Sequence, residues 1–326
     1  PPPAIAIVPR PLVPDMLTVS TYNVNSLKRL LTVIPGDKLC ERVGGATVVA
    51  LQEIRCGQAD WDTDPGLRAL SHAAGAVYAA HCTRKKGYAG TAWVLNSPAA
   101  VRTVNPAEWR SPAALEGRII VLYATTTDDL PLVFINIYQV NTLSEDRIPV
   151  REESHTFVRQ AVLHWQALGA SIILLGDLNV MPNRGDCFDP QRYDTAATAG
   201  TRLMERDYFH KVLCGELGLV DVGRVGEATW FSPPPQPSCH RIDFCLVSPE
   251  LQSRVVEVKT LANVRASDHV PVSVRMKLSI RRWSNATLEA SPAPGLDVTV
   301  RSSRAASSRD IRSFFGSTAT KRRKVE

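Results

Sequence analysis

The sequence lacks the signals that assign a chain to several large classes of protein. Its 7 cysteines are scattered and none form a Cys-x-x-Cys pair, so neither a zinc ribbon nor a thioredoxin-type site is predicted. No apolar run is long enough to cross a membrane, and Pro1–Pro14 lack the basic-then-apolar order of a secretory signal. No internal repeat of solenoid period occurs. We therefore expect a globular protein of the cytosol or nucleus, with reduced thiols and no membrane partner.

The composition is that of a globular enzyme with a basic balance. Hydrophobic residues make up 44% of the 326 residues, which is too many for a disordered chain. The formal net charge is +6 and the sequence pI is near 9.0, which modestly favours a polyanionic partner. Part of the excess charge comes from the basic run Lys321-Arg-Arg-Lys324.

Apolar runs and amphipathic segments predict an α/β domain over residues 15–283. One helix is expected at 152–168, with an apolar face made of Phe157, Val158, Ala161, Val162, Trp165 and Leu168. A second is expected at 204–217, with Gly218 as its C-cap. Many connections are short, which favours a mixed sheet over a purely parallel one. The strand-like runs are Leu17–Val24, Val48–Leu51, Thr91–Leu95, Ile119–Ala124, Leu132–Tyr138, Ile172–Leu175, Ile242–Val247 and Val270–Leu278.

The flanking segments differ from this domain. Residues 1–14 are predicted to be an N-terminal extension. From Ser284 to Glu326 the composition shifts to Ser, Ala, Pro, Arg and Thr, which predicts a disordered tail.

Polar residues stand at the boundaries of the apolar runs. The run at 171–175 continues into Gly176-Asp177-Leu178-Asn179, so a carboxylate and an amide project to the same side of the chain. Antiparallel neighbours bring strand ends and strand starts to one edge of a sheet, and a single crevice is expected to collect these side chains. The boundary residues are Asn23, Asn25, Glu53, Tyr138, Asn141, Asp177, Asn179, Asp243, Asp268 and His269.

Each of these residues also has an ordinary structural explanation. A lone Asp or Asn after a strand usually forms a turn, a lone His is usually a satisfied surface or core residue, and Tyr138 alone would pack. Their shared position at run boundaries favours a functional interpretation.

The chemistry that this set suits is hydrolysis of a phosphodiester. Glu53 and Asp268, with Asn23 or Asn25 nearby, match the oxygen ligands that Mg²⁺ prefers. His269 with Asp243 gives an oriented imidazole. Asp177 can take the proton of an attacking water, and Asn179 can hold that water or a phosphate oxygen. Tyr138 can donate a hydrogen bond to the charge that develops on the phosphate. No Ser or Cys nucleophile is indicated, which favours direct attack by water.

These motifs, in this order, resemble the endonuclease/exonuclease/phosphatase superfamily. They are Asn23, Leu51-Gln-Glu53, Tyr138-x-x-Asn141, Gly176-Asp-Leu-Asn179, Arg241-Ile-Asp243 and Ser267-Asp-His269, spread over Leu17 to Leu278. Within the superfamily the chain is most similar to the exonuclease III type of apurinic/apyrimidinic (AP) endonuclease. The resemblance implies a four-layered α/β sandwich of two packed mixed sheets.

The resemblance also implies an activity and a set of roles. It implies a monomer that uses Mg²⁺ or Mn²⁺ to cleave double-stranded DNA at abasic sites and to process damaged 3′ ends. By motif, the metal set is Asn23, Asn25, Glu53, Asp177, Asn179, Asp268 and His269, and the catalytic set is Tyr138, Asp177, Asn179, Asp243 and His269. Asn141, Trp230, Phe231, His240 and Arg241 are expected to contact DNA, and Asp186 resembles the acid that follows Gly-Asp-Leu-Asn in this family.

Two features resemble the type 2 AP endonuclease branch. Asn25 stands where type 1 enzymes have Asp, and the tail carries Ile311-x-x-Phe314-Phe315, which looks like a box that binds the sliding clamp (PCNA). Ser308 stands where that box usually has Gln, and a chance apolar cluster is the alternative. The run from Lys321 resembles a nuclear localisation signal, or equally a DNA-affinity tail, and we expect a nuclear protein.

The chain also departs from these patterns. No cysteine follows Cys245, so the Cys/His zinc module common in the type 2 branch is absent from this sequence. His240 stands where type 1 enzymes place a Trp that walls the abasic pocket. Trp230 and Phe231 supply aromatic surface for a splayed sugar or base, or they anchor the Pro-rich loop that follows. We expect the loss of this pocket wall to weaken incision at abasic sites more than processing of 3′ ends.

Two other functions stay open at this level. One is a different phosphodiesterase or phosphatase of the same superfamily, acting on RNA or phospholipid. The other is a non-catalytic clamp-binding scaffold, which the presence of Glu53, Asp177, Asp268 and His269 disfavours.

Overall fold

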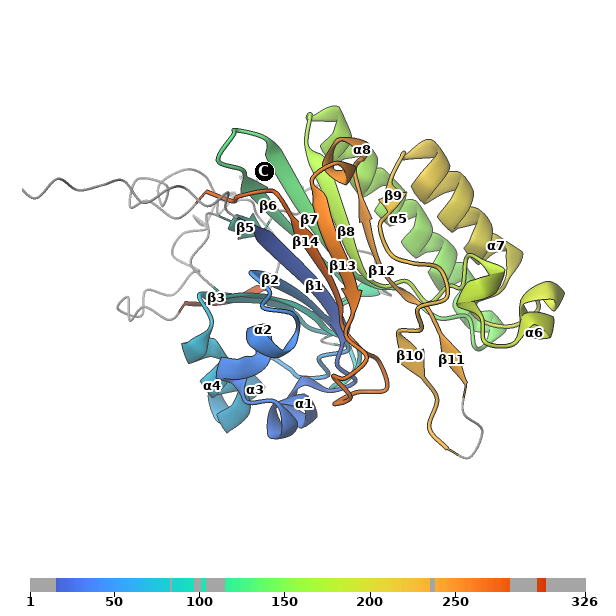
Figure 1. The fold of residues 1–326 in the computed structure, drawn as a ribbon. Coiled ribbons are helices and arrows are strands. Elements are labelled where there is room, and N and C mark those ends of the chain that lie inside the picture. Colours follow the sequence, from blue (N-terminus) through green and yellow to red (C-terminus); the bar gives the residue numbers. More distant parts are fainter. Residues whose placement is uncertain are drawn as a thin grey trace, which may run out of the picture.

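Two β-sheets packed face to face carry most of the strands (Figure 1). The computed structural model describes residues 16–82, 84–96, 101–103, 115–234, 238–281 and 298–302. The clamp-like box at Ile311, Phe314 and Phe315, the basic run at 321–324 and the extension at 1–14 lie outside the described residues. No helix within the described ranges has the length and apolarity that a membrane span requires.

The first sheet has seven strands in the order β13-β14-β1-β2-β4-β3-β15. Only β1 and β2 run parallel, and the other neighbours are antiparallel. The strands are β1 Leu17–Asn23, β2 Val48–Gln52, β3 Ala76–Ala80, β4 Thr91–Leu95, β13 Val255–Thr260, β14 Val272–Met276 and β15 Val298–Ser302. The tail prediction was therefore wrong at 298–302, because this short Val/Thr segment pairs with the edge of β3.

The second sheet has six strands in the order β5-β6-β7-β8-β12-β9. Only β7 and β8 run parallel. The strands are β5 Val101–Thr103, β6 Ile119–Thr125, β7 Pro131–Tyr138, β8 Ser171–Asp177, β9 Val220–Asp221 and β12 Asp243–Val247. A two-stranded ribbon, β10 Trp230–Phe231 with β11 Cys239–His240, stands beside it. Both large sheets are mixed, as predicted.

Side-chain alternation places each strand between two apolar layers. In β8, Ile173 and Leu175 point into the core between the sheets, while Ile172 and Leu174 point to the outer helices. In β2, Val48 and Ala50 face the other sheet, and Val49 and Leu51 face outward. The result is a layer order of helices, sheet, sheet, helices, which confirms the predicted four-layered sandwich.

Short helices cover the first sheet and a long helix covers the second (Figure 1). The first set is α1 Leu27–Val33, η1 Gly36–Lys38, α2 Leu39–Arg42, α3 Asp60–Thr63 and α4 Pro65–Ala73. The second sheet is covered by α5 Ile148–Ala167 and the π-helix η5 Tyr208–Glu216, and α7 Leu203–Asp207 directly precedes η5. The remaining elements are η3 Glu145–Arg147, η4 Arg184–Asp186, α6 Pro190–Thr195 and α8 Pro249–Gln252.

Both predicted helices exist, with changes at their ends. Helix α5 begins at Ile148, because Pro149 in its first turn is compatible with a helix start. Leu168 was wrongly assigned to the buried face: it lies past the last helical residue and is 61% exposed. Gly218 follows the second helical segment with φ +67°, which confirms its C-capping role.

A buried pair of amides joins the two sheets. Gln52 of β2 donates from Nε2 to Oδ1 of Asn136 on β7 over 2.8 Å. Asn136 donates in turn from Nδ2 to the carbonyl oxygens of Leu51 and Ala92, at 3.1 and 2.9 Å. Buried polar groups are costly unless paired, so these bonds favour one docking register of the sheets.

Candidate active site

The predicted polar residues gather where strands from both sheets meet. The carboxyl ends of β1, β2, β7 and β8 and the starts of β12 and β14 bring these residues together. Three contacts, Asn23 with Asp177, Tyr138 with Glu53 and His269 with Asp243, connect the first sheet with the second.

Asp177 occupies the centre of this group. Its Oδ2 accepts hydrogen bonds from Nδ2 of Asn23 at 3.0 Å and Nδ2 of Asn179 at 3.2 Å. Its Oδ1 accepts from the backbone N–H of Asn179 at 3.0 Å. Burial and the neighbouring carboxylate of Asp243 raise the pKa of Asp177 to about 7. A carboxyl group with such a pKa can exchange a proton with water near neutral pH.

Gly176 is required for this placement. Its φ is +147°, and a Cβ atom at this position would lie 1.9 Å from the carbonyl oxygen of Ile137 on the parallel neighbour β7. No side chain fits there, so the Gly-Asp pair lets β8 approach β7 closely just before the carboxylate.

His269 and Asp243 form a buried imidazole–carboxylate pair. Nδ1 of His269 lies 2.8 Å from Oδ2 of Asp243, and Asp243 stands opposite Asp177 in the antiparallel register of β12 and β8. Burial disfavours the charged imidazole, but Asp243 and two further carboxylates outweigh it and raise the pKa of His269 to about 9. His269 is therefore protonated at neutral pH, and Nδ1–H donates to Asp243.

A second cluster contains Glu53, Asn25, Asp268 and Tyr138. The hydroxyl of Tyr138 donates to Oε1 of Glu53, and Nδ2 of Asn25 donates to Oδ1 of Asp268 over 2.9 Å. Burial and the carboxylate of Glu53 raise the pKa of Tyr138 well above its usual value, so it keeps its proton.

The oxygen atoms of this cluster are of the kind that a hard divalent cation prefers, and Oε2 of Glu53 also pairs with Arg55 over 2.9 Å. Two carboxylates, from Glu53 and Asp268, are only partly buried, and the described residues provide no hydrogen-bond donor to Oδ1 of Asn25. Mg²⁺ typically uses one or two carboxylates and keeps several waters. Within the described part of the chain, no group of three or more His, Cys, Asp or Glu side chains is placed so that it could hold a metal ion.

Strained backbone is concentrated at the same edge. Asn25, Glu53 and Asn179 have φ values of 45°, 51° and 47°, in the left-handed region that is unfavourable for non-glycine residues. Such residues persist where the surrounding structure fixes them, and they cluster at functional sites.

The sequence reasoning missed a cationic and aromatic group beside Tyr138. Arg118 is buried, lies 4.5 Å from the Tyr138 ring centroid and donates to the Tyr138 carbonyl oxygen over 3.2 Å. It also donates to the hydroxyl of Tyr88 over 2.8 Å, and Arg147 donates to the same hydroxyl over 3.3 Å. The only sequence signal was Lys85-Lys-Gly-Tyr88, a basic turn with an aromatic residue that reads equally as a solvated loop.

Arg241 does not lie where it was predicted. It is buried and pairs with Asp186 and Asp221 in a structural ion network, so it is unavailable to DNA. Asp186 also accepts hydrogen bonds from the backbone N–H groups of Asn183 and Gly226. Asp186 therefore has a structural role, because it joins the loop at Asn183 to the loop at Gly226.

The aromatic residues near this network are stacked. His240 is buried and lies parallel to Trp230, with ring centroids 5.3 Å apart. Burial lowers the pKa of His240 to about 4, so the ring is neutral. Trp230 and Phe231 stay partly exposed, and Trp230 donates from Nε1 to Asp268 over 3.2 Å, which ties the ribbon to the site. Oδ1 of Asn141 is buried and has no hydrogen-bond partner among the described residues.

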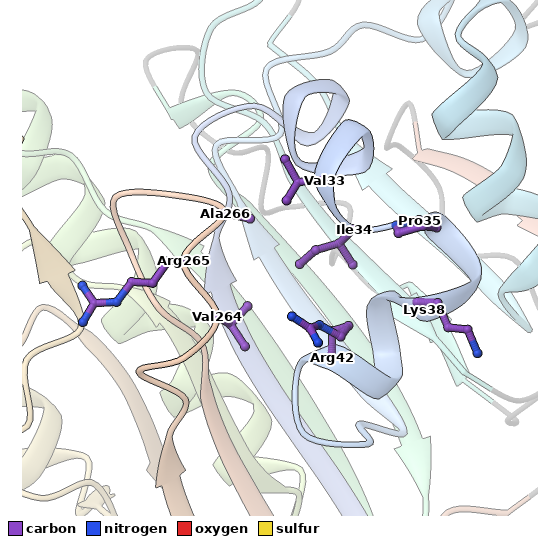
Figure 2. A pocket seen from close by; sticks show the side chains of 8 residues that line it. All are labelled: Val33, Ile34, Pro35, Lys38, Arg42, Val264, Arg265 and Ala266. Atoms are coloured by element: carbon purple, nitrogen blue, oxygen red, sulfur yellow. The ribbon is translucent and has the colours of Figure 1, made fainter.

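A separate pocket lies between the end of α1 and the loop before Asp268. Its volume is about 490 Å³, and Figure 2 shows Ile34, Arg42 and Val264 around the same space. The other lining residues are Val33, Pro35, Lys38, Arg265 and Ala266. None of them belongs to the predicted site, so the candidate active site is a different feature from this pocket.

The fold and this edge of polar groups are those of a four-layered α/β hydrolase. The chain belongs to the Endonuclease/Exonuclease/phosphatase family, whose family model matches residues 20–269. A curated relative, "DNA-(apurinic or apyrimidinic site) endonuclease 2" of Schizosaccharomyces pombe, is 28% identical over 215 residues. The match covers 61% of this chain and 40% of the relative, so the chain spans about two fifths of that protein's length.

Solved structures show the same fold. The AP endonuclease of Leishmania major matches with a TM-score of 0.67 at 22% identity, covering 82% of this chain and 88% of that one. The catalytic domain of Xenopus laevis APE2 matches with a TM-score of 0.67 at 17% identity, covering 82% and 94%. The 3′-5′ exonuclease NExo of Neisseria meningitidis matches with a TM-score of 0.62 at 26% identity, covering 80% and 99%. The chain thus resembles AP endonucleases and 3′ exonucleases, which confirms the resemblance drawn from its motifs.

Proposed function

We propose that this protein is a divalent-metal-dependent DNA nuclease that cleaves phosphodiesters at abasic sites and at damaged 3′ ends. The observation that supports it most is the convergence of the Asp177 group and the His269–Asp243 pair on one edge of the sandwich. The names of the relatives favour DNA as the substrate, and one similar structure is described as a 3′ phosphatase from Neisseria bound to a product DNA hairpin.

Each site residue would have its own role in direct attack of water on the phosphate. Asp177, with a pKa of about 7, accepts the proton of a water that Asn179 helps to hold. Protonated His269, fixed through Nδ1 by Asp243, donates from Nε2 to a phosphate oxygen. The hydroxyl of Tyr138 holds Glu53, and Arg118 beside the Tyr138 ring adds a positive charge.

Glu53, Asp268 and Asn25 would hold Mg²⁺ or Mn²⁺. When bound, such an ion neutralises charge on the scissile phosphate and its leaving oxygen.

A direct comparison of substrates tests the proposal. An abasic duplex, a duplex with a 3′-phosphoglycolate and a duplex with a mismatched 3′ end are incubated with and without Mg²⁺, beside poly(A) RNA and phospholipid vesicles. Mg²⁺-dependent cleavage of the damaged DNA is expected, and Asp177→Asn should abolish it. Preferential turnover of RNA or phospholipid would reassign the protein within its family, and absence of any product from DNA would defeat the proposal.

The clamp and nuclear assignments depend on sequence alone. We propose that Ile311, Phe314 and Phe315 bind the sliding clamp and that Lys321–Lys324 direct the protein to the nucleus, because both motifs occur in a tail rich in small polar residues.

A further inference from the structure

One buried guanidinium contacts both loops that follow the central parallel strands of the second sheet. Arg151 of α5 donates from Nη1 to the carbonyl oxygen of Val140 over 2.5 Å. It also donates from Nη2 to the carbonyl oxygen of Leu178 over 2.8 Å and from Nη1 to that of Asn179 over 3.4 Å. The first acceptor lies just after Tyr138 and the other two just after Asp177, so one side chain bridges two segments of the candidate site.

The opposite side of the guanidinium is also fixed. Nε of Arg151 donates to Nε2 of His155, one helical turn further along α5, over 2.7 Å. Nε2 must therefore be unprotonated, and burial and the charge of Arg151 lower the pKa of His155 to about 2. The imidazole stacks on Tyr208 with ring centroids 3.7 Å apart and an angle of 1° between the planes. The stacked pair of His155 and Tyr208 thus fixes the orientation of Arg151 through its Nε atom.

A buried cation at this position needs an explanation. Arg151 is 1% exposed, and burial lowers its pKa to about 10, so it stays charged at neutral pH. The buried carboxylate of Glu205 stabilises its charge, but among the described residues its hydrogen bonds go to backbone carbonyls and a neutral imidazole. Any cation could balance the charge of Glu205, whereas only a planar fork of donors reaches both loops.

The bridged segments carry the contacts that orient Asp177. Asn179 donates from Nδ2 both to Asp177 and to the carbonyl oxygen of Gln139, at 3.2 and 3.0 Å. Asn179 has a left-handed φ of 47°, which needs support from its surroundings. The bonds from Arg151 to the Leu178 and Asn179 carbonyls supply that support directly.

We propose that Arg151 is a positioning residue that sets the Asn179 amide onto the Asp177 carboxylate by clamping the two loops. This inference rests on the proposed nuclease function for its kinetic readout but not for its structural one. Arg151→Lys keeps the charge and loses the fork, and Arg151→Met keeps most of the volume and loses both. Arg159→Met is the matched control, because Arg159 lies on the same helix, is partly exposed and forms an ion pair with Glu216.

The kinetic experiment measures single-turnover cleavage and DNA binding. Misplacement of a reacting group by about 1 Å can cost about 100-fold in rate. We expect the rate with Arg151→Lys to fall by about 100-fold while the Kd for uncleaved DNA changes less than about threefold, and Arg159→Met to match the wild type. An unchanged rate in folded Arg151→Lys would overturn the inference, as would a fall in rate fully explained by weaker DNA binding. Wild-type protein that cleaves nothing overturns the proposed function instead.

The structural experiment needs no activity. Hydrogen exchange followed by mass spectrometry compares residues 139–142 and 178–181 in wild type and Arg151→Lys. Faster exchange confined to these segments, with β6, β7 and β8 unchanged, is the expected result. Uniformly faster exchange would show a general loss of stability and defeat the positioning role, as would no change in the two segments. If Arg151→Met does not fold, Arg151→Lys still decides between these outcomes.

Discussion

Replacing Asp243 by Asn tests the electrostatic reasoning about the site. In the wild type we expect a bell-shaped dependence of the cleavage rate on pH, with an acid limb near pH 7 from Asp177 and an alkaline limb near pH 9 from His269. Asp243 raises both pKa values, because its carboxylate disfavours ionisation of Asp177 and favours protonation of His269. Removing its charge therefore moves both limbs to lower pH.

The size of the shift follows from the contact. A hydrogen bond to a charged partner contributes about 1.5–3 kcal/mol, and one pKa unit corresponds to about 1.4 kcal/mol. The alkaline limb with Asp243→Asn is thus expected about 1–2 units lower, near pH 7–8. We also expect the maximal rate to fall by on the order of 10²–10⁴, the usual contribution of an oriented acid–base group.

The assay is single-turnover cleavage of an abasic duplex from pH 5.5 to 10 at fixed Mg²⁺. Asp194→Asn is the control, because Asp194 carries the same charge on the surface and pairs with Arg184 away from the site. Its profile should match the wild type. A large fall in rate with Asp243→Asn and an alkaline limb that stays near pH 9 would refute the assignment of that limb to His269.

Three further perturbations test other parts of the molecule. Gly176→Ala places a Cβ atom against the Ile137 carbonyl, so we expect a loss of about 3 kcal/mol or more in the free energy of unfolding, and an unchanged urea midpoint would contradict the close approach of these strands. The pKa of His155 is lower in the folded protein than in the unfolded chain, so its neutral ring stabilises the fold fully above pH 6.5, and this stabilisation is lost as the pH falls, at up to about 1.4 kcal/mol per pH unit. Urea unfolding at pH 7 and pH 5.5 should therefore show a smaller loss of unfolding free energy for His155→Gln than for the wild type. Phe314→Ala with Phe315→Ala should leave cleavage of short DNA unchanged and remove stimulation by the clamp, and equal stimulation of both proteins would exclude the box.

The sequence was sufficient for the strands and for most of the site. The eight predicted strands all exist, because Val- and Ile-rich runs alternate between two apolar layers and their ends are marked by polar residues. Glu53, Asp177 and His269 were found because each stands at the boundary of such a run.

Other features depend on contacts between distant segments, which a single sequence does not encode locally. Arg241 reads as a surface cation, and only the folded chain reveals Asp186 and Asp221 beside it. The sequence likewise does not show that Arg118 and Arg151 are buried, because the carbonyl oxygens that accept their hydrogen bonds lie on other strands and loops. Strand β3 escaped notice because its alanines carry little β-preference, and it exists by pairing with β4.

The contacts between the two sheets have a consequence for when the protein acquires activity. Asn23, Glu53 and His269 come from one half of the sandwich, and Asp177, Tyr138 and Asp243 from the other. The half that carries His269 is completed by strands from both ends of the domain. A chain that stops before Asp268 lacks His269 and with it part of the candidate site, so the complete site forms only after the last strands of the domain have been made.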